Sequence, residues 1–79
     1  MFKTITINDK RIAYDDEHTD FLVQVGKGPK GSYRTKYSFK GNILKAVMYY
    51  NAINIGKGYK KRLYMPSSSA NPVIAVARS

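Results

Sequence analysis

The sequence predicts an α+β fold, in which a small antiparallel β-sheet of four to six strands carries one α-helix on one face. A chain of 79 residues is long enough for one small domain, so residues 1–79 are expected to form a single unit. Several short segments alternate polar and apolar side chains, as strands do. One segment, about residues 43–55, has apolar residues at helical spacing, and strands around a single helix favour a helix on one sheet face.

The N-terminal segment predicts a β-hairpin. Phe2–Ile7 alternates in character and is rich in β-branched residues, which favour strands. Asn8 and Asp9 suit a two-residue turn, and a second strand follows at Lys10–Tyr14. We therefore expect these two strands to pair with each other.

The next two predicted strands flank a glycine-rich loop. A polar, acidic loop over residues 15–20 leads to Phe21–Val25, whose alternation predicts a third strand. Ser32–Lys40 has the clearest period of two in the chain and is expected to pair with the third strand. This alternation puts Tyr33, Thr35, Tyr37 and Phe39 on one face, and Arg34, Lys36, Ser38 and Lys40 on the other.

The loop between those strands, VGKGPKG at residues 25–31, has the spacing G-x-G-x-x-G of a nucleotide-binding loop. A dinucleotide-binding loop needs a helix after its glycines, whereas a strand follows here and Pro29 removes an amide donor. The glycine loop of kinases does lie between strands, but the acidic residues that kinases require are missing. We interpret the segment as a hairpin loop whose cationic tip, with Lys27 and Lys30, can contact a phosphate. Capture of a small anionic nucleotide by this loop is a further alternative.

The predicted helix covers Ile43–Ile55. Asn42 is a candidate N-cap, and Gly56 is expected at the C′ position, where a positive φ costs glycine little. The polar face of this helix is thin, which leaves Met48 and Tyr49 for a protein contact or a homodimer.

Two more strands complete the predicted fold, at Tyr59–Met65 and Pro72–Arg78. The serine-rich connector between them, residues 66–72, is expected to be a mobile loop.

Charge is the most informative part of the composition. Fourteen Lys and Arg face five Asp and Glu, which gives a net charge of +9. All five acids lie in the first twenty residues, whereas residues 21–79 contain eleven basic residues and no acid. A surface without a bound partner usually mixes both signs, so this distribution indicates an anionic partner.

Composition also narrows the function class and the location. The absence of cysteine removes disulfides, thiolate metal sites and cysteine nucleophiles. No segment resembles a signal peptide or a membrane-spanning helix, so we expect a cytoplasmic protein, in the host cytoplasm if it is phage-encoded.

We expect no enzyme activity, no catalytic residue, no metal site and no cofactor. His18 lies beside Asp15, Asp16 and Glu17, but structural metal sites need more regular ligand spacing, so a solvated turn is favoured. The serines at 67–69 have no base near them in the sequence. A further hypothesis is that the acidic turn folds back over the basic surface and shields it.

Two basic and aromatic segments are the positive signal for function, residues 33–40 and 57–64. Lys and Arg neutralise phosphates, and Tyr and Arg planes stack on unpaired bases, so these segments favour nucleic-acid binding. The rings at 33, 37 and 39 also fit a core face, which is the favoured interpretation for them. The predicted nucleic-acid-binding residues are Lys27, Lys30, Arg34, Lys36, Lys40, Lys60, Lys61 and Arg62.

Residues 21–55, with SYRTKYSFKGNILKAVMYYNAI at their centre, resemble the sheet and helix of phage integrase arm-type DNA-binding domains. In that family the sheet enters the major groove. The resemblance implies that Lys27, Lys30, Arg34 and Lys36 face DNA.

In size, basic charge and lack of catalytic groups, the chain also resembles small phage accessory proteins of the anti-CRISPR or host RNA polymerase inhibitor type. That resemblance implies the alternative function: stoichiometric binding that blocks an acidic or nucleic-acid-binding surface of a host factor or defence complex. A blocking protein would bind through a few anchor residues, for which Met48, Tyr49, Tyr59 and Tyr64 are the candidates.

Overall fold

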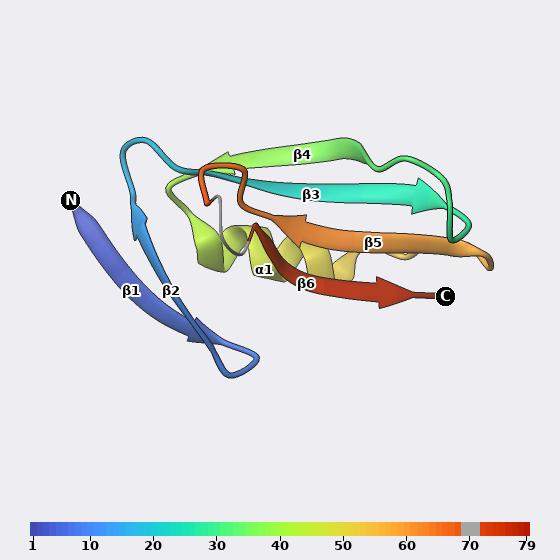
Figure 1. Cartoon of the computed structure of the whole chain (residues 1–79), viewed down its shortest axis with the longest axis horizontal. Helices are drawn as coiled ribbons and strands as arrows, with labels where there is room; N and C mark the ends of the chain where they lie inside the picture. The colour runs from blue at the N-terminus through green and yellow to red at the C-terminus, as the bar shows by residue number, and fades with distance from the viewer. Residues whose placement is uncertain (69–71) are drawn as a thin grey trace.

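A computed structural model describes residues 1–68 and 72–79 and confirms the α+β fold. Two antiparallel sheets are present, one of β1 and β2 and one with the strand order β4-β3-β5-β6 (Figure 1). The elements are β1 (Phe2–Ile7), β2 (Lys10–Asp15), β3 (Asp20–Lys27), β4 (Arg34–Lys40), α1 (Ile43–Ala52), β5 (Tyr59–Tyr64) and β6 (Val73–Arg78). Of the serine-rich connector, residues 69–71 lie outside the described part. In the described ranges, no helix has the length and apolar character needed to cross a membrane.

The N-terminal hairpin forms as predicted. β1 and β2 pair antiparallel in a register that puts Ile7 opposite Lys10. Asn8 and Asp9 form the turn with φ values of 50° and 64°. Two consecutive residues at positive φ give the turn the twist that a two-residue hairpin requires.

One face of the four-stranded sheet is covered. α1 packs on β3, β4 and β5, and the hairpin contributes Ile12 and Tyr14 to the same core. Phe21, Val23 and Leu63 from the sheet meet Ile43, Ala46 and Tyr50 of α1 in this core. In Figure 1 the helix lies behind the four strands, and no helix or strand lies over their near face. We call this near face the uncovered face.

The start of α1 follows the prediction, but its end does not. Asn42 caps the helix, because its side-chain oxygen accepts a hydrogen bond from the Lys45 backbone N–H at 3.0 Å. The helix ends at Ala52, and Ile53 is already extended, so Gly56 is not its C′ residue.

A lysine from the sheet explains this early end. The Lys61 ammonium donates to the carbonyl oxygens of Tyr50 at 2.6 Å and Ile53 at 3.3 Å. The last carbonyls of a helix lack partners within it, and a cation that binds them satisfies them without a glycine. This contact depends on tertiary structure and has no local signal.

The predicted alternation of β4 holds only for its C-terminal half. Tyr37 lies opposite Val23 on the α1 side of the sheet, whereas Thr35 lies opposite Gln24 on the uncovered face. Lys36 is the extra residue between them, so the register shifts at a β-bulge. One additional residue moves every side chain before it to the other face.

The bulge therefore separates residues that were predicted to share a face. Arg34 lies opposite Val25 on the α1 side. Tyr33 lies on the uncovered face, where its ring contacts Arg62. The predictions that Arg34, Lys36 and Lys40 share one strand face, and that Tyr33 faces the core, are thus wrong. Tyr37 does lie on the α1 side but is 53% exposed, so of the three rings only Phe39 packs against the core.

Candidate nucleic-acid interface

A groove opens on the α1 side of the sheet, beyond the C-terminal end of the helix. Its volume is about 590 Å³, and Val25 and Tyr59 lie in its wall. An adjoining hollow of about 190 Å³ shares Val25 and Tyr59 and reaches residues 53–56. Three cations line the larger hollow, namely Lys27, Arg34 and Lys36. We call this hollow the cationic groove.

The cations of this groove have no protein partner among the described residues. Every ion pair found in residues 1–68 and 72–79 joins the Met1 ammonium, Lys3 or His18 to the acidic residues 15–17. No side-chain hydrogen bond within the same ranges involves Lys27, Arg34 or Lys36. A cleft lined by one sign of charge attracts ions of the opposite sign.

The glycine loop supports this groove as a hairpin loop, as interpreted from the sequence. Gly28 has a φ of +67° in the turn that follows β3. A side chain at Gly31 would collide with the carbonyl oxygen of Lys27, so the backbone crosses itself closely there. Lys30 is exposed at the tip, next to the groove.

The basic residues of β5 have partners inside the protein. Lys60 is only 8% exposed, and its ammonium donates to the Pro29 carbonyl at 3.2 Å and lies 4.7 Å from the centre of the Tyr33 ring. Lys61 holds the end of α1 and lies 4.6 Å from the centre of the Tyr50 ring.

Arg62 points to the uncovered face, where it contacts Gln24 and two tyrosine rings. Lys40 lies at the far end of β4, opposite Asp20. The eight predicted binding residues therefore do not form one surface. Lys27, Lys30, Arg34 and Lys36 gather at the groove, and the other four lie elsewhere.

The four predicted protein-contact residues also separate. Met48 is 70% exposed on α1, beside a second exposed apolar side chain, Leu44. The centres of the Tyr49 and Tyr37 rings lie 4.4 Å apart. The pKa of the Tyr49 hydroxyl is raised, mainly by burial. Tyr59 lines the groove and Tyr64 lies on the uncovered face, so neither belongs to the helix patch.

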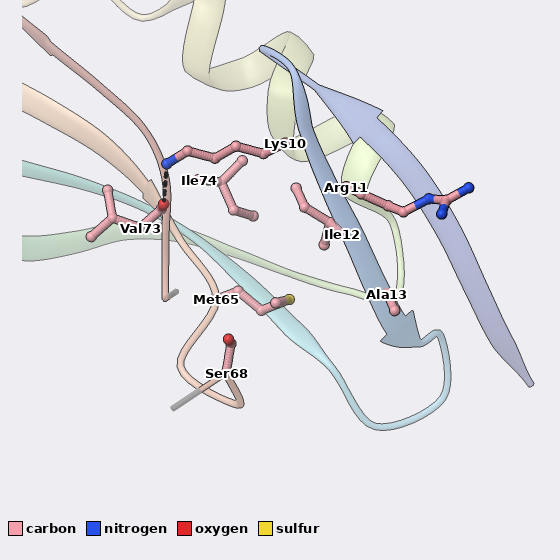
Figure 2. Close-up of a pocket in the computed structure, with 8 residues that line it drawn as sticks. All are labelled: Lys10, Arg11, Ile12, Ala13, Met65, Ser68, Val73 and Ile74. Carbon is pink, nitrogen blue, oxygen red and sulfur yellow. Dashed lines mark hydrogen bonds between the residues drawn. The ribbon is translucent and has the colours of Figure 1, made fainter. Parts of the chain in front are cut away.

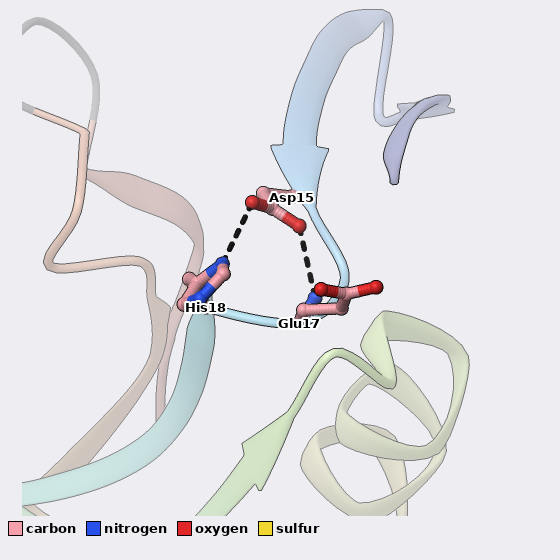
Figure 3. Close-up of side chains that lie close together, drawn as sticks. All are labelled: Asp15, Glu17 and His18. Carbon is pink, nitrogen blue, oxygen red and sulfur yellow. Dashed lines mark hydrogen bonds and ion pairs between the residues drawn. The ribbon is translucent and has the colours of Figure 1, made fainter.

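The acidic turn lies at the opposite end of β3 from the groove. Asp15 and His18 are joined by a hydrogen bond of 2.8 Å, and Asp15 also accepts the backbone N–H of Glu17 at 3.0 Å (Figure 3). The hydrogen bond with His18 is the main reason why the pKa of Asp15 falls to about 2. Asp16 pairs with the Met1 ammonium at 3.1 Å and with Lys3 at 3.2 Å, which lowers its pKa as well.

These contacts bear on two sequence interpretations. The eight residues of β3 separate the acidic turn from the groove by about 23 Å, so the turn does not cover the groove in this structure. Ligand atoms of Asp15, Glu17 and His18 lie within 4.8 Å of one another, but these atoms already have partners in the protein: Asp15 is hydrogen-bonded to His18, and the Met1 ammonium pairs with both Asp15 and Glu17.

A second cavity lies where the hairpin meets β6 (Figure 2). Its volume is about 300 Å³, and Ile12, Met65 and Ile74 form much of its lining. The Lys10 ammonium crosses to the Val73 carbonyl at 3.3 Å and joins the two sheets there. Among the residues that the structure describes, no acid or histidine lines this cavity, so we interpret it as a packing seam.

No protein-family model matches the chain, and no curated protein or solved structure matches it. Its function is therefore inferred from its own residues. Sequence reasoning missed one contact group, Tyr33 with Arg62, because the bulge in β4 reverses the direction of Tyr33. The alternation of β5 puts Lys60, Arg62 and Tyr64 on one face. This signal in the sequence could have placed Arg62, but not Tyr33.

Proposed function

We propose that this protein is a nucleic-acid-binding module that contacts phosphates through the cationic groove. The proposal is carried by one observation, which is that Lys27, Arg34 and Lys36 surround one groove without a carboxylate partner in the described chain. Lys and Arg side chains of this kind neutralise nucleic-acid phosphates and release their counterions. Lys30, at the neighbouring loop tip, extends the same cationic surface.

Salt dependence tests the proposal. Four phosphate contacts imply that log affinity falls against log salt with a slope of about −3.6 on duplex DNA and about −2.8 on a single strand. Labelled oligonucleotides titrated at about 50 and 200 mM salt measure this slope. Arg34→Ala or Lys36→Ala should flatten it by roughly 0.7 to 0.9 each.

Lys45→Ala is the matched control, because Lys45 is an exposed cation on α1 outside the groove. It should leave the slope unchanged. Absence of binding at the lower salt concentration, or an equal effect of Lys45→Ala, would contradict the proposal.

A second candidate function is stoichiometric inhibition of another protein, and the exposed face of α1 favours it. Leu44 is 63% exposed and Met48 is 70% exposed, one helical turn apart. Neighbouring exposed apolar side chains mark many protein contacts, including homodimer interfaces. The same face also fits a homodimer, which is a separate proposal. Sedimentation velocity of the wild type and of Met48→Glu tests this self-association, and a purely monomeric wild type would contradict the homodimer.

A further inference from the structure

The uncovered face of the sheet contains a group of side chains that the groove does not use. Arg62 of β5 lies at its centre, opposite Gln24 of β3. Tyr33 and Tyr64 lie on either side along the uncovered face, and we call these four residues the Arg62 stack.

Hydrogen bonds fix the orientation of the arginine. Its Nε donates to the Gln24 side-chain oxygen at 2.6 Å. The Gln24 amide nitrogen in turn donates to the Thr35 hydroxyl at 3.1 Å, so the amide cannot turn freely. Gln24 is itself buried, which keeps water from competing for these bonds.

Two rings hold the guanidinium plane. The guanidinium carbon of Arg62 lies 4.0 Å from the centre of the Tyr33 ring and 4.3 Å from that of Tyr64. No hydrogen bond or ion pair within residues 1–68 and 72–79 uses the terminal nitrogens of Arg62. The stack therefore presents free N–H donors that have already lost their conformational freedom, which lowers the entropic cost of binding.

We infer that the Arg62 stack binds an unpaired nucleotide, and that the nucleic acid recognised by this protein is single-stranded. This inference rests on the proposed function, because the groove supplies most of the phosphate contacts. A duplex hides the faces of its bases within the helix, whereas a single strand can place a base on a tyrosine ring. The free guanidinium donors then contact a phosphate or an acceptor on the base edge.

The two surfaces can serve one strand. Tyr33 directly precedes Arg34, and the bulge directs the first to the uncovered face and the second to the α1 side, where the groove lies. A single strand that bends around this part of the edge strand β4 can reach both. A rigid duplex cannot follow that bend without deformation.

The test compares one labelled oligonucleotide as a single strand and in a duplex, at about 50 mM salt, by fluorescence anisotropy. We expect the wild type to prefer the single strand. Arg62→Lys keeps the charge but removes the planar group, so it should weaken single-strand binding, with little change for the duplex. Loss of a tyrosine ring that stacks on a base should weaken single-strand binding roughly 5- to 150-fold. Tyr64→Leu should act in the same direction, and Tyr64→Phe, which keeps the ring, should bind like the wild type.

Thermal melting shows which variants remain folded. If Arg62→Lys does not fold, Tyr64→Leu still tests the same site. Equal single-strand and duplex affinities in the wild type and in both variants would overturn the inference and leave the groove proposal intact. Binding of neither form would overturn both. Tight binding of a poly-glutamate peptide that is lost in Arg62→Lys, without a single-strand preference, would make the stack a carboxylate site and overturn the inference.

Discussion

Two groups of cations lie side by side on the same sheet and have different surroundings. Lys60 and Lys61 on β5 each donate a hydrogen bond to a backbone carbonyl oxygen. The cations of the groove have no such acceptor among the described residues, although Arg34 and Lys61 both lie opposite Val25, on either side of it. A basic residue that binds a backbone carbonyl stabilises the fold, whereas one without a partner is free to bind an anion. Charge counted from the sequence does not distinguish the two.

The largest expected effect tests the β5 group. Lys61→Ala removes two hydrogen bonds from a charged donor and leaves two helix-end carbonyls without it, so the free energy of unfolding should fall by about 2 kcal/mol. Urea denaturation measures this change. Oligonucleotide affinity, measured where both proteins are folded, should change by less than about threefold, well below the roughly eightfold effect expected of a phosphate contact.

Lys61→Met keeps the aliphatic stem beside the Tyr50 ring and separates packing from charge. If Lys61→Ala left unfolding unchanged but weakened nucleic-acid binding about eightfold, Lys61 would belong with the groove cations and the comparison would fail.

In the groove, we expect a substitution to lower oligonucleotide affinity and to leave the free energy of unfolding nearly unchanged. Arg34→Ala should change the free energy of unfolding by less than about 0.5 kcal/mol, because no partner is lost. It should weaken binding roughly eightfold at about 0.1 M salt, which is the contribution of one phosphate contact. Urea denaturation and anisotropy on the same preparation give both values.

Lys40→Ala is the control on the same strand. Lys40 lies at the far end of β4, opposite Asp20 and away from the groove, so its loss should weaken binding less than twofold. An effect as large as that of Arg34→Ala would show that the binding surface follows the whole strand, as the sequence pattern predicted.

Local signals in the sequence were enough for much of the fold. The turn at Asn8 and Asp9 and the cap at Asn42 depend on neighbours in the chain, and both are found where they were predicted. All six strands are found within two residues of their predicted ends, with β3 extending through Lys27 into the predicted glycine loop. The single helix and the hairpin loop at residues 28–31 follow from equally local patterns.

Two features could not be predicted because they depend on contacts between distant segments. The bulge at Lys36 exists only in the pairing of β4 with β3, and it decides which face Arg34 and Tyr33 occupy. The end of α1 depends on Lys61, which comes from a strand later in the chain. The sequence therefore indicated which basic and aromatic residues are candidates for binding. Their separation into the cationic groove and the Arg62 stack could be seen only in the structure.

The smallest expected effect extends the comparison to the carboxylates. Asp15 belongs to the charges with partners, since its hydrogen bond with His18 lowers its pKa to about 2. A lowered pKa means that the contribution of Asp15 to stability is complete above about pH 4, its ordinary range, and is lost as pH falls through about 2. Asp15→Asn should remove that part of the pH dependence, so thermal melting temperatures of variant and wild type should differ most above pH 4 and converge toward pH 2.

The same variant tests whether the acidic turn acts on the groove. Because Asp15 lies at the other end of β3 and is bound to the Met1 ammonium and His18, Asp15→Asn should leave oligonucleotide affinity within about twofold of the wild type at about 0.15 M salt, where charges this distant are largely screened. Asp9→Asn, in the turn between β1 and β2, removes a carboxylate that forms no ion pair in the described chain and is the control for net charge. A clear gain of affinity in Asp15→Asn but not in Asp9→Asn would mean that the turn reaches the groove in solution. The division between charges that hold the fold and charges that bind would then fail for the acids.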